Sequence, residues 1–330
     1  MQAGDLWLKS AEAQNLERMT LEQYQQHLRL HIVPFMGRTK LSKLTAPAVR
    51  AFADKLREEG RSGTMVKYII RSLGGLLSDA QERGLIVRNP VIELRGRRRG
   101  QRKGEGQDRR GKKLKVGIDI PAPDEIKRIV SAASGKWRPL LLTAIFSGLR
   151  SSELRGLRWQ DIDFKKAELH VRQRADKFRK IGPPKSEAGE RIVPLPPMVV
   201  ATLREWRLAC PNGTLGLCFP NGKGNPEFHN NVIHRGLWPT LVAAGVVMVD
   251  KDTGAVSAKY TGLHSLRHFY ASWCINRKAD GGLELPAKVV QARMGHSSIM
   301  VTLDTYGHLF PRNDDTKEMA DAEAALLGLT

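Results

Sequence analysis

Four stretches in the C-terminal two thirds of the chain combine cationic side chains with groups that can transfer protons. They contain Arg150 in GLRSSEL, Lys185 in PPKSEAGER, His264 and Arg267 in HSLRH, and His296 and Tyr306 in MGHSSIMVTLDTYGH. His264 and Arg267 are three positions apart, so on a helix they share one face. Two cationic or near-cationic groups side by side repel each other unless an anion lies between them. The spacing therefore predicts an anion at this face.

This set of side chains suits a phosphodiester. Two guanidinium groups can clamp both non-bridging oxygens and hold the extra charge of a pentacovalent transition state. An imidazole can pass protons near neutral pH, and an ammonium can protonate a leaving oxygen. A tyrosine hydroxyl, with an unperturbed pKa of about 10, becomes a better nucleophile when nearby cations favour its ionisation. Since Gly307 follows Tyr306 at the end of a helical pattern, we expect this tyrosine to be presented rather than packed.

Each of these residues also has a common structural role. An arginine after an apolar helix usually caps that helix, and a tyrosine is most often a core aromatic with a bonded hydroxyl. His264 and His268 have the i, i+4 spacing of a zinc-binding helix, but Ser265 stands where an HExxH enzyme has its glutamate. No clear third ligand follows. We therefore expect neither a metal nor a cofactor.

The charge balance points to a polyanionic partner. The chain of 330 residues has 54 Lys and Arg against 34 Asp and Glu, a net charge of +20, which is typical of proteins that bind DNA, RNA or an acidic membrane surface. No apolar run is long enough to span a bilayer and no charged-then-apolar leader opens the sequence, so we expect a cytosolic protein without a membrane partner. The three cysteines have no CxxC spacing, which favours neither a disulfide framework nor a cysteine-rich zinc site.

Residues 95–115 hold eleven cationic and two acidic side chains, five glycines and one apolar side chain. Such a segment cannot bury enough surface to order itself, which predicts a basic flexible linker over 95–120. This segment could be a solvated hinge or a sorting signal, or it could lie as a strap along a DNA phosphate backbone. The charge density favours the strap. The predicted DNA contacts are Arg95, Arg97, Arg98, Arg99, Arg102, Lys103, Arg109, Arg110, Lys112 and Lys113.

Helical periodicity dominates residues 1–94. A capping box formed by Thr20 and Gln23 opens a helix that Pro34 closes. A second helix is expected from Thr45 to Gly60, and a third from Thr64 with Gly84 as the residue after its end. These patterns predict an all-α domain.

Residues 121–330 predict a mostly helical α+β domain. A helix is expected to begin at Pro123, and further helices are expected at 137–148, 196–207, 265–277, 286–295, 298–306 and 315–328. Between them, AELHVRQ and ERIVPL alternate apolar and polar residues, which indicates a short antiparallel pair. VVMVDKDTGAVSA reads as a hairpin that turns at Thr253 and Gly254. Its acidic residues resemble the start of a calcium loop, whose later ligands are missing.

The order, spacing and flanking residues of the five motifs resemble the tyrosine recombinase (phage integrase) family over about residues 121–312. The family pattern is an Arg in GLRxxEL, a Lys on a β-hairpin, HxxR on a helix, then GH and a tyrosine shortly after. The resemblance implies a helical core-type DNA-binding domain at 1–94 and a catalytic domain with the tyrosine recombinase fold at 121–330. It further implies Tyr306 as nucleophile, Arg150 and Arg267 as phosphate clamps, Lys185 as general acid, and His264 and His296 as proton-transfer and hydrogen-bonding groups. Because Lys177 and Lys180 lie in the same loop as Lys185, the lysine assignment is the least secure.

The resemblance also implies a reaction and partners. In this family the tyrosine attacks a DNA phosphodiester and leaves a 3′-phosphotyrosyl link and a free 5′-hydroxyl, without metal or ATP. The two domains close around double-stranded DNA, and the C-terminal helix packs on a neighbouring protomer, which predicts a homotetramer on two DNA sites. An excision or directionality factor is a further expected partner. Many members carry a small domain ahead of the core-binding helices, which we expect this sequence to lack.

Three alternatives to a mobile-element integrase stay open from the sequence. A Xer-like resolvase or a type IB topoisomerase would use the same chemistry, although a topoisomerase works as a monomer. A non-catalytic DNA-binding repressor would keep the fold without the reaction. The six candidate catalytic side chains argue against the repressor.

Overall fold

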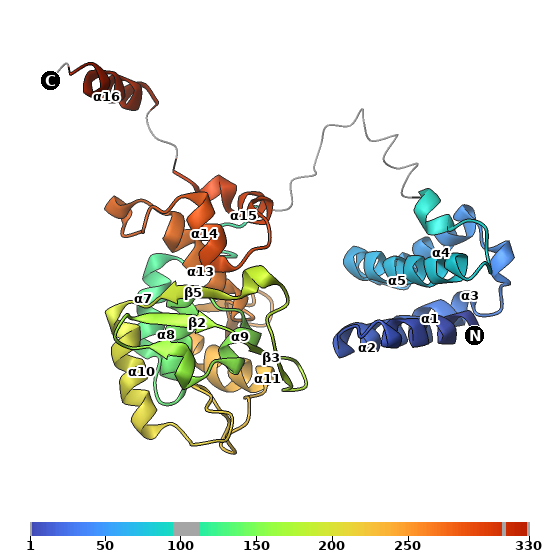
Figure 1. Ribbon diagram of the computed structural model, residues 1–330, viewed down its shortest axis with the longest axis horizontal. Helices are drawn as coiled ribbons and strands as arrows, with labels where there is room; N and C mark the ends of the chain where they lie inside the picture. The colour runs from blue at the N-terminus through green and yellow to red at the C-terminus, as the bar shows by residue number, and fades with distance from the viewer. Residues whose placement is uncertain (1, 95–112, 312–314, 329–330) are drawn as a thin grey trace. The chain divides into compact units, whose positions relative to one another are not determined.

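The computed structural model describes residues 2–94, 113–311 and 315–328, and its internal contacts divide the chain into two units. The first unit is Met1–Asp108 and the second is Arg109–Thr330. The first is helical, and the second is mostly helical with small antiparallel sheets (Figure 1). The predicted fold class is confirmed. Each unit is described by itself below.

The first unit is built from helices around one apolar core. Its elements are α1 (Gln2–Ala13), α2 (Arg18–His27), the π-helical η1 (Leu28–Ile32), α3 (Val33–Met36), the 3-10 turn η2 (Leu41–Lys43), α4 (Ala46–Glu58) and α5 (Gly63–Glu82). The apolar stripe of α4 meets that of α5, and the core they share includes Val49, Phe52, Leu56, Ile69, Leu73 and Leu77. The helix predicted from Thr45 is present as α4, and the Thr45 hydroxyl accepts a hydrogen bond from the Ala48 amide at its start. As predicted, Gly84 follows α5, with φ +72°.

Two sequence predictions for the first unit are wrong. Helix α1 was not anticipated, because its apolar residues are sparse; Trp7 nevertheless lies in the core and stacks on Tyr24 with ring centroids 4.4 Å apart. The next helix begins at Arg18 rather than at Thr20, and Pro34 does not end it. The π-helical turn before Val33 changes the hydrogen-bond register, which places Pro34 in the first turn of α3, where a missing N–H is tolerated.

The second unit begins with three helices and a small sheet. The helices are α7 (Pro123–Ala132), α8 (Trp137–Ser147) and α9 (Ser151–Gly156), followed by the 3-10 turn η3 (Trp159–Asp161). Strands β1 (Ile162–Asp163), β2 (Glu168–Val171) and β5 (Arg191–Pro194) form an antiparallel sheet in the order β1-β2-β5, with Leu169 opposite Val193. The antiparallel pair predicted from AELHVRQ and ERIVPL is therefore confirmed. A separate hairpin of β3 (Arg174–Ala175) and β4 (Ile181–Gly182), then η4 (Glu187–Gly189), lies between β2 and β5 in the sequence.

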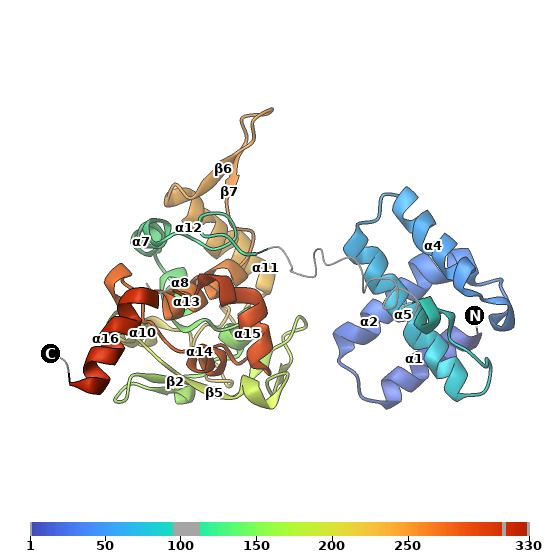
Figure 2. The same ribbon diagram turned by 90° about the horizontal axis from the view of Figure 1, so that it is seen from above.

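Helices make up most of the rest of the second unit. They are α10 (Pro197–Ala209), α11 (His229–Asn231), the π-helical η5 (Val232–Leu237), α12 (Trp238–Ala243), α13 (His264–Ile275), η6 (Lys278–Asp280), α14 (Ala287–Met294), α15 (Ile299–Tyr306), η7 (Gly307–Leu309) and α16 (Asp315–Leu327). The predicted hairpin is present as β6 (Val247–Val249) and β7 (Val256–Ala258), and it projects from the body of the unit (Figure 2). Helix α8 is buried along most of its length and packs against α10 and α13.

Helices α13, α14 and α15 pack in sequence order at one end of the second unit (Figure 1). The residues just before α7 also belong to this unit, although composition assigns them to the linker. Ile120 is fully buried, and the Nε2 atom of His308 lies 2.8 Å from the Leu114 carbonyl oxygen. Within residues 2–94, 113–311 and 315–328, no helix has both the length and the apolar composition that crossing a bilayer requires.

Substituting Gly148 tests how tightly the end of α8 is packed. Gly148 has φ +62°, and an added Cβ would lie 2.3 Å from Cδ1 of Tyr270. We expect Gly148→Ala to lower the free energy of unfolding by roughly 2–5 kcal/mol, because backbone strain and overpacking add. Urea unfolding followed by tryptophan fluorescence measures the loss, since five of the six tryptophans lie in this unit.

The matched control is Gly254→Ala in the β6–β7 turn. Gly254 also has a positive φ, +68°, but an added Cβ would meet no atom within 4 Å. Backbone strain alone should cost about 1 kcal/mol there. Equal losses in the two variants would contradict the packing argument.

Candidate active site

Arg150 lies between two helices and is held by a carboxylate and the main chain. Gly148 ends α8 in the left-handed conformation, and Arg150 immediately precedes α9. The Arg150 amide donates to Oε2 of Glu153 over 2.9 Å, and its guanidinium donates to Oε1 of Glu153 over 2.8 Å and to the Gly295 carbonyl over 3.0 Å. Arg150 therefore starts α9 and does not cap α8.

Arg267 is the more deeply buried of the two candidate clamps. It lies one turn into α13, is 2% exposed, and donates from its two Nη atoms to the carbonyl oxygens of Gly148 and Met294. Burial, and secondarily Arg150, lowers the pKa of Arg267 to about 9. It remains a cation at neutral pH. Both guanidinium groups are thus anchored to the segment 294–295, Arg150 through the Gly295 carbonyl and Arg267 through the Met294 carbonyl.

Glu153 is the counter-charge at the centre of this arrangement. Its carboxylate also accepts two hydrogen bonds from Arg191 of β5, one of them 2.8 Å long. Burial alone would raise the pKa of Glu153, but Arg191 and Arg150 outweigh it and lower the pKa to about 2. Glu153 and Arg191 both lie inside the sequence motifs, but neither was predicted to have a role in the site. The sequence contained a signal for each residue. Glu153 lies three residues after Arg150 in GLRSSEL, and Arg191 lies in the predicted strand ERIVPL.

Tyr306 is the last residue of α15 and is 2% exposed, so the prediction that it is presented rather than packed is wrong. Thr302, one turn earlier, is fully buried too, which shows that this face of α15 lies against the core. The Tyr306 hydroxyl lies 2.7 Å from Nδ1 of His268. Burial raises the pKa of Tyr306 to about 12, although Arg267 and Arg150 oppose the shift.

Of the two candidate histidines, His296 lies beside the Tyr306 ring. The His296 ring is nearly parallel to the Tyr306 ring at a centroid distance of 6.2 Å, and its Nδ1 lies 2.9 Å from the Thr302 hydroxyl. Burial, followed by Arg267 and Arg150, lowers the pKa of His296 to about 4, so it is neutral at pH 7. His264 lies at the first turn of α13 with part of its surface exposed. Desolvation by the protein atoms around its ring, and secondarily Arg267, lowers its pKa as well.

Lys185 is exposed in the loop between β4 and η4. The turn η4, which follows that loop, lies against the site. Arg191 donates to the Gly189 carbonyl over 2.9 Å, and a Cβ added to Gly295 would be 2.9 Å from the Ala188 carbonyl. The alternatives Lys177 and Lys180 flank the turn of the β3–β4 hairpin instead. This anchoring favours Lys185 as the lysine that can reach the site.

The structure therefore groups Arg150, Arg267, His264, His296 and Tyr306, with Lys185 on an adjoining loop. His268, which sequence reasoning considered only as a zinc ligand, is the residue it missed. In the part of the chain that the structure describes, no three or more His, Cys, Asp or Glu side chains are placed to hold a metal ion. Of the ten predicted linker contacts only Lys113 is described, and it is exposed; the other nine lie outside the described residues.

Comparisons with protein families match both units. The phage integrase family matches residues 122–312, and the N-terminal SAM-like domain of phage integrases matches residues 4–57. A protein named tyrosine recombinase XerC-like, from Caldanaerobacter subterraneus subsp. tengcongensis, is 26% identical over 94% of this chain and 80% of its own length.

Two solved structures share the fold. The Tn1549 transposon integrase in complex with transposon right end DNA has a TM-score of 0.71 at 20% identity, covering 98% of this chain and 99% of that chain. A lambda integrase tetramer bound to a Holliday junction has a TM-score of 0.61 at 18% identity, covering 90% of this chain and 77% of that chain.

Neutralising the central carboxylate tests its electrostatic role. The pKa of Glu153 is lowered from 4.5 to about 2, so its contribution is present above pH 4.5 and is lost as the pH falls toward 2. We expect Glu153→Gln to reduce the free energy of unfolding by about 3 kcal/mol at pH 7, with the deficit shrinking below pH 4.5. Urea unfolding at pH 7, 5 and 4 measures this trend. Asp280→Asn, which breaks an ion pair that is about half exposed, should cost less than about 1 kcal/mol and serves as control.

Proposed function

Because the chain belongs to the phage integrase family, we propose that it is a tyrosine-type site-specific DNA recombinase, the integrase of a phage or another mobile element. The observation that carries the proposal is the pair of anchored guanidinium groups beside Tyr306, where both influence the ionisation of its hydroxyl. This arrangement fits an anion that the tyrosine is about to attack.

We assign Arg150 and Arg267 to the scissile phosphate. Each guanidinium has five N–H donors, and its contacts with protein carbonyl and carboxylate oxygens occupy only some of them. The remaining donors can bind the non-bridging oxygens, and the fixed charges stabilise the additional negative charge of the transition state. Because both groups are already anchored, little reorganisation is needed when DNA binds.

In the cleavage step the Tyr306 oxygen attacks phosphorus. The bond from this oxygen to phosphorus forms while the bond from phosphorus to the 5′ oxygen breaks, which leaves a 3′-phosphotyrosyl link. Lys185 donates a proton to the departing 5′ oxygen, and His264 and His296 serve as proton-transfer and hydrogen-bonding groups at the phosphate. A 5′-hydroxyl from the partner strand reverses the step. One phosphodiester replaces another, so the reaction uses neither metal nor ATP.

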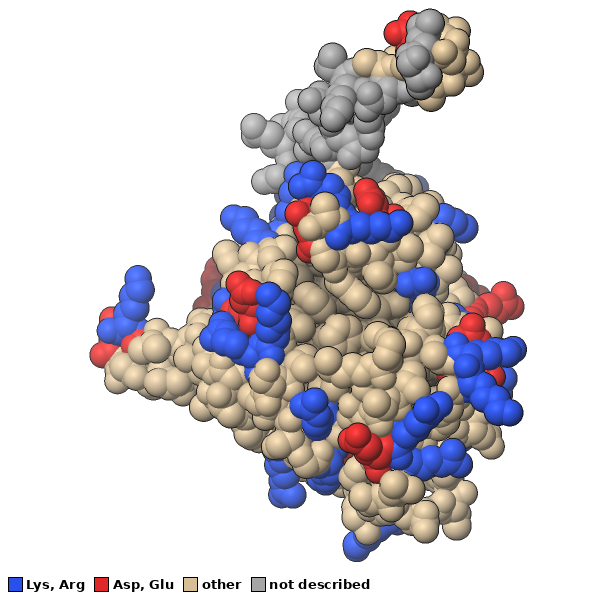
Figure 3. Space-filling view, turned by 90° about the vertical axis from the view of Figure 1, so that its left-hand side faces the viewer, with Lys and Arg blue, Asp and Glu red and all other residues tan. Residues whose placement is uncertain are grey.

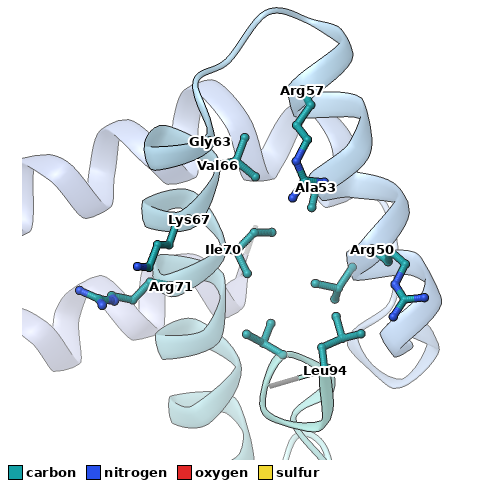
Figure 4. A pocket seen from close by; sticks show the side chains of 11 residues that line it. Arg50, Ala53, Arg57, Gly63, Val66, Lys67, Ile70, Arg71 and Leu94 are labelled. Carbon is teal, nitrogen blue, oxygen red and sulfur yellow. The ribbon is translucent and has the colours of Figure 1, made fainter. Parts of the chain in front are cut away.

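We further propose that the first unit grips the DNA. A groove between α4 and α5 has an apolar floor that includes Ala53, Val66 and Ile70. Four cationic side chains line it: Arg50, Arg57, Lys67 and Arg71 (Figure 4). On the face of the chain visible in Figure 3, by contrast, Lys and Arg residues are scattered and interspersed with Asp and Glu. The concentrated charge of the α4–α5 groove is the better support for a DNA-backbone contact.

The active assembly we propose is a homotetramer on two double-stranded DNA sites. The lambda integrase tetramer bound to a Holliday junction supports this assembly by its likeness in fold. On α16, Met319, Leu326 and Leu327 are 73%, 85% and 60% exposed, which suits a helix that packs on a neighbouring protomer. An excision or directionality factor would set the direction of recombination. We also propose that the protein acts on the chromosome in the bacterial cytoplasm, and its likeness to a recombinase from a bacterium supports this.

A Xer-like resolvase is the second candidate, since a XerC-like protein covers 94% of this chain. The DNA target distinguishes it from an integrase, because a resolvase recombines two copies of one chromosomal site and an integrase joins two different sites.

Replacing the nucleophile tests the reaction. We expect the wild-type protein, expressed in bacteria that carry the element's DNA, to form covalent protein–DNA adducts at a few defined positions. Tyr306→Phe should form none, because it lacks the attacking oxygen. Lysis in denaturing detergent, recovery of the adducts and sequencing of the joined ends measure this and identify the DNA site.

Other outcomes would change the assignment. Scattered wild-type adducts would indicate a topoisomerase. If neither protein gives adducts on a nicked duplex that prevents religation, the protein only binds DNA, and the repressor alternative holds. Adducts that persist in Tyr306→Phe would contradict the choice of nucleophile.

Removing a charge from the α4–α5 groove tests the proposed backbone contact. Lys67→Ala should weaken binding to any duplex and reduce the slope of log affinity against log salt concentration by about 1, because one phosphate contact is lost. Fluorescence anisotropy over a salt series measures the slope. Lys9→Ala, which removes an exposed lysine from α1, is the control; an equal change in both variants would contradict a specific role for the groove.

A further inference from the structure

The cleavage step requires a specific acceptor for the proton of the Tyr306 hydroxyl. Tyr306 attacks as an oxygen nucleophile, and its hydroxyl proton must go to an acceptor when the bond to phosphorus forms. Lys185 delivers a proton at the other side of the phosphorus and cannot act as this acceptor in the same step. A second group is therefore required, and it has to lie within hydrogen-bonding distance of the Tyr306 hydroxyl.

His268 meets this requirement. Its Nδ1 lies 2.7 Å from the Tyr306 hydroxyl oxygen, and among the described residues it is the one side chain in hydrogen-bonding distance of that oxygen. His296 lies parallel to the Tyr306 ring, and its Nδ1 contacts the Thr302 hydroxyl instead. His264, one turn before His268, packs its ring against the His268 ring at 4.4 Å.

The ionisation states fix the direction of this hydrogen bond. Burial raises the pKa of Tyr306 to about 12, so the hydroxyl keeps its proton at neutral pH. Burial also lowers the pKa of His268 to about 4, with smaller contributions from His264 and Arg267, so its imidazole is neutral. The hydroxyl can then donate to an unprotonated Nδ1, provided that the imidazole proton is on Nε2. This is the arrangement that precedes proton transfer.

We propose that His268 is a catalytic residue that accepts the proton of Tyr306 during strand cleavage. As the bond from the Tyr306 oxygen to phosphorus forms, the hydroxyl proton moves to Nδ1 of His268, and the imidazole becomes an imidazolium. The bond from phosphorus to the 5′ oxygen breaks, and that oxygen takes a proton from Lys185. In religation both protons move back. This inference rests on the proposed function and identifies His268, rather than His264 or His296, as the acceptor of this proton.

Substrate binding would make His268 a stronger base. The charged and titratable groups that act on it are His264 and Arg267 on its own helix, Tyr306 on α15, and Asp119 before α7, whose carboxylate favours the imidazolium. A phosphodiester bound to Arg267 and Arg150 adds a negative charge that offsets the effect of Arg267 on His268. The same charge disfavours a free phenolate at Tyr306. The proton should therefore leave while the bond to phosphorus forms, rather than before.

The test distinguishes the proton that leaves the Tyr306 hydroxyl from the proton that Lys185 supplies. Its DNA is a duplex containing the recovered site, made with either the ordinary scissile phosphate or a sulfur atom replacing the 5′ bridging oxygen. A sulfur leaving group departs without protonation, so Lys185→Ala should be slow on the oxygen duplex and close to wild type on the sulfur duplex. His268→Asn keeps an oxygen acceptor near the place of Nδ1 but cannot take a proton. We expect it to form adducts about 100-fold more slowly than wild type on both duplexes.

The pH dependence of the single-turnover rate on the sulfur duplex gives a readout that a structural role would not change. The wild-type rate should rise with pH and level off once His268 is unprotonated in the complex. In His268→Asn the rate should rise about tenfold per pH unit from pH 6 to 9, because Tyr306, with a pKa near 12, must then ionise first. His308→Asn is the matched control. It makes the same change two residues beyond Tyr306, where the ring contacts the Leu114 carbonyl, and should stay within about threefold of wild type.

Thermal unfolding and DNA affinity are measured for each variant, and His268→Gln replaces His268→Asn if the latter does not fold. Rates within about threefold of wild type on both duplexes would overturn the proposal. A slower rate with the wild-type pH profile would also overturn it, because His268 would then only position the tyrosine. If wild-type protein forms no adducts that depend on Tyr306 on either duplex, it is the proposed function that fails.

Discussion

The arrangement of the second unit depends on the hydrogen bonds to two neighbouring guanidinium groups, those of Arg150 and Arg267, at the edge of its core. Such cations are costly to bury unless oxygen atoms surround them. Here the oxygens come from three carbonyls and one carboxylate, contributed by the end of α8, the start of α9 and the end of α14. Satisfying Arg150 and Arg267 therefore fixes how segments far apart in the sequence meet, and the same contacts position the groups that would bind a phosphate.

Without bound DNA the site is strongly cationic, but Tyr306 is not in its reactive, ionised form. Its arginines stay charged, while burial keeps the imidazoles of His268 and His296 neutral and the Tyr306 hydroxyl protonated. Positive charge without a reactive nucleophile attracts an anion without attacking it. A bound phosphodiester would change the balance in favour of proton transfer, because it offsets the cations that lower the pKa of His268. The reactivity of Tyr306 would therefore depend on whether a phosphodiester is bound in the site.

Much of this site follows from the sequence, because linear motifs contain the residues that it brings together. Each of the five grouped residues lies in a motif with characteristic neighbouring residues, and the helices that hold them have regular apolar periods. What could not be predicted arises from contacts between segments. The burial of Tyr306 depends on the packing of α14 against α15 and on His268 of α13. The role of Glu153 depends on Arg191, which comes from a strand 38 residues later in the sequence. Likewise α1 owes its existence to the packing of Trp7 on other helices rather than to its own pattern.

Gly295 shows how this architecture limits change. Its carbonyl holds Arg150, its φ is +61°, and an added Cβ would lie 2.9 Å from both the Ala188 carbonyl and the Arg191 guanidinium. A library that diversifies this protein toward new DNA targets would therefore find residue 295 closed to every side chain, even though glycine itself performs no chemistry. Variation has to enter through exposed positions such as Tyr68 on α5, where a new side chain leaves the contacts of Arg150 and Arg267 unchanged.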